Sequence, residues 1–112
     1  MYKIILLPIL TATFTLASTD MLPPSEASKE LAYIATDNYE CNYYLELAGQ
    51  DLLHLANYDT SHKPAQVTKL YQAFMEHSTR AREICIHINQ LVADDISEIQ
   101  DDITYFYKQN YK

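Results

Sequence analysis

The chain has 112 residues, of which 15 are acidic and eight are basic, so its formal charge is −7 at neutral pH. This length corresponds to one domain. Such an acidic protein is a poor partner for nucleic acids and anionic membrane surfaces, because phosphate groups attract lysine and arginine. If the protein has a charged partner, we expect that partner to be basic.

The first residues have the composition of an export signal. Lys3 is followed by an apolar run of 14 residues, Ile4–Ala17, and by small residues before the first acid, Asp20. A positive charge, a short apolar core and a small-residue cleavage site describe a cleaved secretory signal peptide. The run is shorter than the ~20 residues that an ordinary transmembrane helix needs. We predict a signal peptide over residues 1–17, cleaved near Ala17–Thr19, and no stable membrane insertion afterwards.

Export places the chain in an oxidising compartment, where an even number of cysteines indicates a disulfide. We predict that the chain's two cysteines, Cys41 and Cys85, are bonded to each other. The sequence contains no Asn-x-Ser/Thr glycosylation site. A bacterial periplasm is therefore the expected location, and the extracellular space is the alternative.

Apolar residues recur at spacings of four and three over residues 25–57, which predicts one long helix. Residues 18–24 should form an extended lead-in, because Pro23 and Pro24 oppose helix formation before them. The stripe consists of Ala27, Leu31, Ile34, Asn38, Cys41, Leu45, Ala48, Leu52 and Leu55. Cys41 lies within this stripe, so it should face a partner helix.

A second helix is predicted from about Ser61, with Pro64 in its first turn. Its apolar stripe consists of Leu70, Phe74, Ala81, Cys85, Ile88, Val92, Ile96, Ile99, Ile103 and Phe106. In an antiparallel pair centred on residue 63, the midpoint of the two cysteines, residues equally far before and after residue 63 face each other. This register places most members of the first stripe opposite apolar residues of the second helix. Residue 63 also lies in the only plausible turn, residues 58–64. These features predict an antiparallel helical hairpin locked by one disulfide.

The second stripe contains no glycine or proline, so its helix either runs unbroken to about Gln109 or bends near Ala93–Asp95 and folds back as a third helix. Both predicted helices carry further apolar residues that a bare hairpin cannot bury: Tyr39, Tyr43, Tyr44, Leu47, Leu53, Ile84, Ile86 and Leu91. We therefore predict an all-α domain over residues 25–112. In it the hairpin is completed by a third helix or by dimerisation into a helical bundle.

The sequence offers little for catalysis or for a cofactor. A di-iron bundle needs two Glu-x-x-His motifs, whereas the nearest spacing here is the single pair Glu83 and His87. The cysteines are used by the disulfide, and the only glycine, Gly49, lies inside a predicted helix instead of a phosphate-binding loop. We expect no enzymatic activity, no metal site and no cofactor.

Tyrosine is enriched at protein interfaces, and the chain has ten tyrosines and no tryptophan. The candidate partner surface comprises Tyr39, Tyr43 and Tyr44 in the first helix, and Tyr105 and Tyr107 near the C-terminus. An acidic run in the second helix is either a solvated face or a docking surface for a basic partner; it comprises Asp94, Asp95, Glu98, Asp101 and Asp102.

These observations favour an exported small helical protein that acts by protein–protein binding, of the inhibitor, immunity or chaperone type. The small, helical, single-disulfide layout resembles, in architecture, that of periplasmic immunity proteins and acid-stress chaperones. One alternative is a structural or self-assembling component of the cell envelope. The other is a haem or metal carrier built in a helical bundle.

Overall fold

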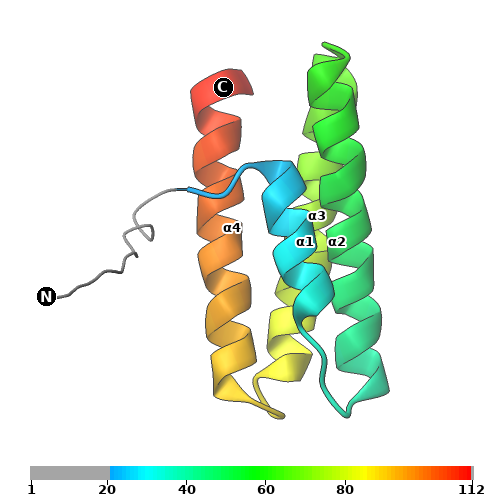
Figure 1. The fold of residues 1–112 in the computed structure, drawn as a ribbon, viewed down its shortest axis with the longest axis vertical. Coiled ribbons are helices and arrows are strands. Elements are labelled where there is room, and N and C mark those ends of the chain that lie inside the picture. Colours follow the sequence, from blue (N-terminus) through cyan, green and yellow to red (C-terminus); the bar gives the residue numbers. More distant parts are fainter. Residues whose placement is uncertain (1–20, 112) are drawn as a thin grey trace, which may run out of the picture.

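The computed structural model of the chain describes residues 21–111. Within them, four α-helices alternate in direction and no strand is present (Figure 1). The helices are α1 (Pro24–Tyr33), α2 (Tyr39–Thr60), α3 (Pro64–Cys85) and α4 (Gln90–Tyr111). The predicted signal peptide lies outside the described residues. In the part that the structure describes, no helix is both long enough and apolar enough to cross a membrane.

Helices α2 and α3 form the predicted antiparallel hairpin. The Cys41–Cys85 disulfide joins them with the two Cα atoms 5.2 Å apart. Small buried side chains favour this close approach: Ala81 lies one turn from Cys85, and Ala48 and Ser78 lie two turns from the cysteines. The turn between the helices has His62 in the left-handed region, with φ 59°. The all-α fold and the disulfide-locked hairpin are confirmed.

The prediction of one helix over residues 25–57 is wrong, because the chain reverses at residues 34–38. Asn38 caps α2: its Oδ1 accepts a hydrogen bond from the backbone N–H of Cys41 (2.8 Å). Helix α1 then packs back on α2, and the Ser28 hydroxyl donates to the carbonyl of Gly49 (3.0 Å). The predicted apolar stripe is still buried despite this reversal, because its residues in α1 and its residues in α2 face the same core.

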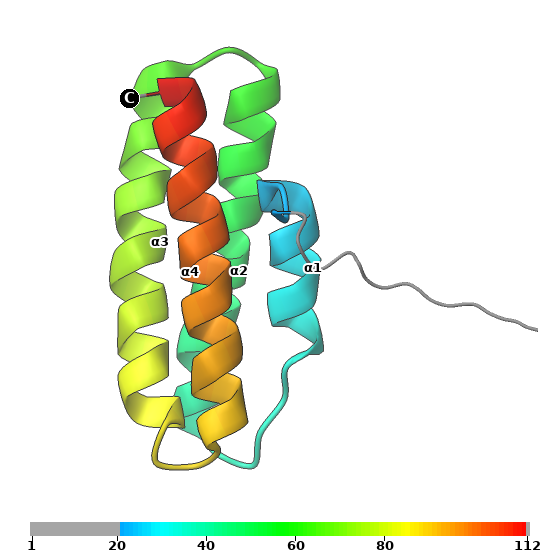
Figure 2. The same cartoon turned by 90° about the vertical axis from the view of Figure 1, so that its left-hand side faces the viewer.

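The second predicted helix is also broken, four to eight residues before the expected bend at Ala93–Asp95. Helix α3 ends at Cys85 and α4 begins at Gln90. The Oδ1 atom of Asn89 accepts the backbone N–H of Leu91 (2.9 Å) and so caps the new helix. Helix α4 folds back along α3, as one of the two predicted alternatives required, and completes the bundle within a single chain (Figure 2).

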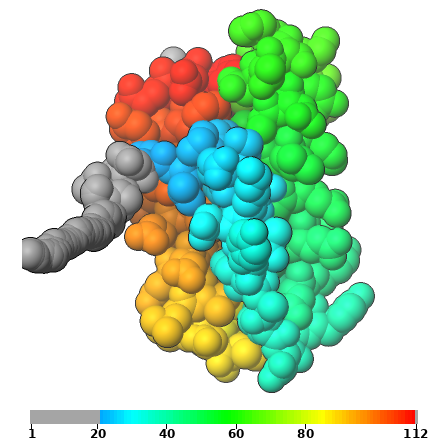
Figure 3. Space-filling model, viewed as in Figure 1, coloured from blue at the N-terminus to red at the C-terminus, as the bar shows by residue number. Residues whose placement is uncertain are grey.

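The core lies between the four helices, and α1 fills the space between α4 and α2 (Figure 3). Its buried members come from every helix: Ala27, Leu31, Cys41, Leu45, Ala48, Leu52, Phe74, Ala81, Cys85, Val92, Ile96, Ile99 and Ile103. Ile88 is a correction to the predicted stripe, because it lies in the linker between α3 and α4 and is exposed. Leu22 packs against the core from the extended segment before α1, and its backbone N–H bonds Asp102 (3.3 Å).

A buried polar network between α3 and α4 has no counterpart in the sequence-based expectations. The Gln100 side-chain amide donates to Ser78 Oγ (2.8 Å) and Thr79 Oγ1 (3.1 Å). Its Oε1 accepts a hydrogen bond from Arg82 (2.8 Å). Because a buried amide without partners is costly, this network favours one register of α4 against α3.

Candidate functional site

The α1–α2 linker, residues 34–38, and the α3–α4 linker, residues 86–89, lie at the same end of the bundle, the lower end in Figures 1 and 2. We call this region, residues 33–43 and 85–95, the disulfide end. A hollow of about 290 Å³ separates the linkers there and is lined by Ala35, Thr36, Asp37, Ile88 and Asn89. Segments about 50 residues apart in the sequence therefore build one surface.

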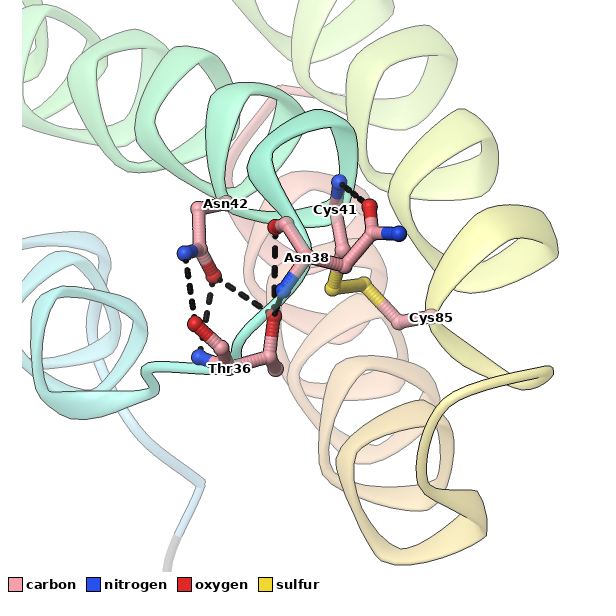
Figure 4. Close-up of a disulfide and its surroundings, with 5 residues drawn as sticks. All are labelled: Thr36, Asn38, Cys41, Asn42 and Cys85. Atoms are coloured by element: carbon pink, nitrogen blue, oxygen red, sulfur yellow. Dashed lines mark hydrogen bonds between the residues drawn. A yellow bond between two sulfur atoms is a disulfide. The ribbon is translucent and has the colours of Figure 1, made fainter.

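The first linker is held in place by a local hydrogen-bond network (Figure 4). The Asn42 side chain bonds the Thr36 backbone through both polar atoms: Oδ1 accepts from N–H (3.0 Å) and Nδ2 donates to C=O (2.8 Å). The Thr36 hydroxyl also donates to Asn42 Oδ1 (2.8 Å). The fully buried Cys41–Cys85 bond ties α2 to the end of α3 beside this network. Together these bonds hold the first linker, α2 and the end of α3 in one arrangement.

Six of the ten large apolar side chains that are exposed in the described residues belong to the disulfide end. The exposed fractions reach 86% for Tyr33, 83% for Tyr39 and 71% for Leu91. The other three are Tyr43, Ile86 and Ile88. Such a concentration of exposed apolar area marks an interaction surface more often than a solvated one.

The first predicted tyrosine group is a continuous row of rings. Tyr39 stacks on Tyr43 with centroids 6.4 Å apart, and Tyr43 meets the edge of Tyr44 at 5.2 Å. Tyr44 is partly buried against the core, and the Arg80 guanidinium lies 5.9 Å from its ring centroid. Tyr39 and Tyr43 are therefore available to a partner, whereas Tyr44 supports them from beneath.

The second predicted group does not join the first. Tyr105 and Tyr107 lie in the last turns of α4, at the opposite end of the bundle (Figure 1). Tyr105 is half-exposed, but Tyr107 stacks on Tyr71 with centroids 4.2 Å apart and bonds Thr68 through its hydroxyl (2.8 Å). Tyr107 thus contributes to the α3–α4 contact, and of these two tyrosines only Tyr105 has an exposed ring.

The disulfide end carries carboxylates but no lysine or arginine. Its exposed carboxylates are Asp37, Glu40, Asp94 and Asp95. The sequence contains no lysine or arginine from residue 30 to 62 or from residue 84 to 107. The two arginines of the sequence, both in α3, are already engaged: Arg80 lies 3.6 Å from Glu83, and Arg82 belongs to the Gln100 network. The field around the exposed apolar residues is therefore negative.

Three other hollows lie along the helices. The first, of about 370 Å³, runs between α1 and α2 over Gly49; its lining includes Leu31, Leu45 and Leu53, and it reaches Asn42. The second, of about 690 Å³, lies over α2 and α3 and extends from His77 to Tyr44 and Glu83. The Nδ1 atom of His77 is 2.6 Å from a carboxylate oxygen of Asp51. The third, of about 310 Å³, lies at the opposite end of the bundle, and its lining includes Tyr58 and Lys69. Within residues 21–111, no three histidine, cysteine, aspartate or glutamate side chains gather closely enough to hold a metal ion.

Burial also perturbs two ionisable groups of α4, one in the middle of the helix and one at its end. Partial burial raises the pKa of Asp102 above its ordinary value of 3.8, the hydrogen bond from Leu22 opposes this shift, and the neighbouring charge of Asp101 adds to it. Burial and a hydrogen bond to the Asp59 carboxylate raise the pKa of Tyr111 to about 12. Both contacts tie chain segments together.

No protein-family model, curated protein or solved structure matches this chain. Any functional assignment therefore depends on the geometry and chemistry of its own residues.

Residue type alone pointed to Tyr39 and Tyr43, and the structure brings them together on an exposed surface. The aliphatic half of the disulfide end was missed, because Ile88 fits the core stripe and Ile86 and Leu91 read as extra apolar residues on a continuous helix. The sequence does contain a signal for the break between α3 and α4, because asparagine is a favoured N-cap residue and Asn89 caps α4.

Proposed function

We propose that this protein is an exported binding protein that captures a protein partner through the apolar side chains of its disulfide end. The observation that supports this most directly is the exposure of Tyr33, Tyr39 and Leu91 beside a core that is already closed. Folding does not require these side chains to be apolar. A partner that covers them would remove their contact with water.

The rigidity of the disulfide end also favours binding. Ordering a mobile loop on association costs free energy that is subtracted from the affinity. Here the Thr36–Asn42 hydrogen bonds and the adjacent Cys41–Cys85 bond meet that cost during folding. Stacked aromatic rings such as Tyr39 and Tyr43 lose few rotamers when covered, as in the anchors of other protein interfaces.

Three types of binding protein fit this proposal: an inhibitor, an immunity protein and a chaperone. An inhibitor or immunity protein has one tight partner, whereas a chaperone has many weak ones. Self-assembly through this end is disfavoured, because two copies would bring Asp37, Glu40, Asp94 and Asp95 against the same four carboxylates. The envelope-component alternative would therefore need another surface.

The test is a capture experiment with the tagged, disulfide-bonded mature chain and the envelope or secreted fraction of its own host. Tyr39→Ser with Leu91→Ser removes exposed apolar area from the disulfide end without touching the core. Leu53→Ser is the matched control, because Leu53 is a half-exposed residue of α2 outside the disulfide end.

We expect the parent chain and the Leu53→Ser control to retain the same partner or partners, and the double variant to lose them. Tyr105→Ser, made alongside, tests the second tyrosine group. Equal capture by the parent and the double variant would refute the proposed binding surface. One stoichiometric partner would identify an inhibitor or immunity type, and many partners would identify a chaperone.

A further inference from the structure

We propose that the hollow between the two linkers receives a lysine or arginine side chain from the partner, flanked by apolar partner residues that cover Tyr39 and Leu91. This inference rests on the proposed function, because it assigns the chemistry of the segment that binds the same surface. The partner segment is thereby specified as cationic and amphipathic.

The size and lining of the hollow suit a single side chain. Its volume of about 290 Å³ lies just below the usual range for sites that enclose whole small molecules, roughly 300–1,000 Å³. Most of its lining is polar; Asp37 is the only charged residue that lines it, and Ile88 and Ala35 contribute the smaller apolar part. The cationic head of a lysine or arginine matches the acidic, mainly polar lining, and the aliphatic stem matches the apolar border.

The side-chain oxygens of the other two polar residues in the lining, Thr36 and Asn89, are already engaged. The Thr36 hydroxyl bonds Asn42, and Asn89 Oδ1 accepts the N–H of Leu91. Asp37 is exposed, and the ion pairs found in residues 21–111 all lie elsewhere. The Asp37 carboxylate is therefore the group left to meet a cation.

The residues around the hollow also favour a cationic partner segment. Glu40, Asp94 and Asp95 add negative charge around it, and no lysine or arginine of linkers 34–38 and 86–89 offsets that charge. An acidic partner segment would meet four like charges, whereas a basic one is attracted over a distance of about 10 Å at moderate salt. The negative charge of the disulfide end therefore favours a positively charged partner segment, and the exposed apolar side chains supply the contact area.

The inference can be tested with synthetic peptides in place of the unidentified partner. Three fluorescent 14-residue helical peptides share one leucine face and carry lysine, glutamine or glutamate on the other face. Fluorescence anisotropy measures their Kd for the full disulfide-bonded mature chain at 50 and 300 mM salt. Asp37→Asn removes the proposed contact, and Glu76→Gln on α3 is the matched control for the loss of one exposed carboxylate.

We expect the lysine peptide to bind about tenfold more tightly than the glutamine peptide at low salt, and the glutamate peptide to bind most weakly. Asp37→Asn should weaken the lysine peptide about fivefold, near the upper limit for an accessible ion pair, and leave the glutamine peptide unchanged. Glu76→Gln should change neither. Circular dichroism melting confirms that each variant is folded.

The outcomes separate this inference from the proposed function. Equal weakening by Asp37→Asn and Glu76→Gln would mean that only the overall charge matters, and would refute the site in the hollow. Equal affinity for the three peptides, or binding by none, would refute a cationic partner, while the capture experiment with Tyr39→Ser and Leu91→Ser would still stand. If the variant with Tyr39→Ser and Leu91→Ser still bound the lysine peptide and the natural partner as the parent does, both the proposed function and this inference would be refuted.

Discussion

The ring of Tyr71 on α3 lies parallel to the ring of Tyr107 on α4, with a centroid distance of 4.2 Å and an interplanar angle of 1°. Each hydroxyl forms a hydrogen bond with a threonine of the other helix: Tyr71 with Thr104 on α4 (3.0 Å) and Tyr107 with Thr68 on α3 (2.8 Å). A residue chosen from sequence as a partner contact is therefore part of the bundle itself.

Replacing Tyr107 should accordingly affect folding before it affects binding. Tyr107→Phe keeps the stacked ring and loses one hydrogen bond, for a cost of about 1 kcal/mol. Tyr107→Ala also loses the ring contact and should cost roughly 2–3 kcal/mol. Urea unfolding measures both. Tyr105→Ala, at an exposed site two residues away, is the control and should change stability little. Equal effects at the two positions would contradict this division of roles.

The disulfide should supply a large part of the stability. It closes a loop of 44 residues, for which the chain-entropy relation gives about 4 kcal/mol. We expect Cys41→Ser with Cys85→Ser to lower the melting temperature by roughly 15 °C or more in a domain of this size. Reduction of the parent chain under denaturing conditions, followed by melting under reducing conditions, provides the comparison. An unchanged melting temperature would show that the bond adds nothing to the closed core.

The turn between α2 and α3 can be improved. His62 has φ 59°, and the backbone N–H groups of His62 and Lys63 bond the carbonyls of Asp59 and Tyr58 (3.1 and 3.0 Å), the pattern in which glycine is preferred at the His62 position. His62→Gly should stabilise the protein by roughly 0.5–1 kcal/mol, since a side chain in this region of φ is strained. His62→Ala should give no such gain. Thermal melting of the two variants decides between them.

The stability of the protein should depend on pH through Asp102. Its pKa is raised in the folded state, so the folded protein binds a proton at this site more readily than the unfolded chain does. The ionised group therefore destabilises the fold at neutral pH, and this penalty disappears as the pH falls through the folded pKa towards 3.8. Asp102→Asn retains an acceptor for the N–H of Leu22 and removes the penalty.

We expect Asp102→Asn to be more stable than the parent at pH 7 and no more stable at pH 3. Glu98→Gln, an exposed site on the same helix, is the control for the change in net charge. Urea unfolding at the two pH values measures the difference. A gain for Asp102→Asn that is equal at both pH values would rule out the titration of Asp102 as its cause.

The hydrophobic stripe was predictable from sequence, but the ends of the helices were not. Leu31, Ile34, Asn38 and Cys41 keep helical spacing across the first linker, so periodicity cannot distinguish a continuous helix from two helices that share one core. The cluster Thr36-Asp37-Asn38 consists of residues that favour caps and turns, and it was the available sign of a break. The break after Cys85 had the weaker signal of Asn89 alone.

The candidate site was predictable in part for the same reason. Aromatic residue type identified Tyr39 and Tyr43, whose exposure depends only on the outer face of α2. The contribution of Ile88 depends on the linker that brings it beside Ala35 and Asp37, and that linker follows from a tertiary reversal. Gln100 gave no warning, because a glutamine is buried only when Ser78 and Arg82 are positioned to satisfy it.

The placement of the disulfide gives the molecule a property of a two-chain protein. Residues 61–66, at the turn between α2 and α3, are all exposed, and such turns are preferred sites of proteolytic cleavage. A cut at residues 61–63 leaves α1 and α2 on one fragment and α3 and α4 on the other, each a helical hairpin. Cys41–Cys85 still joins the fragments at the far end of the bundle. A nicked molecule therefore migrates as one species until it is reduced, and it keeps the end that carries Tyr39, Asp37 and Leu91 intact.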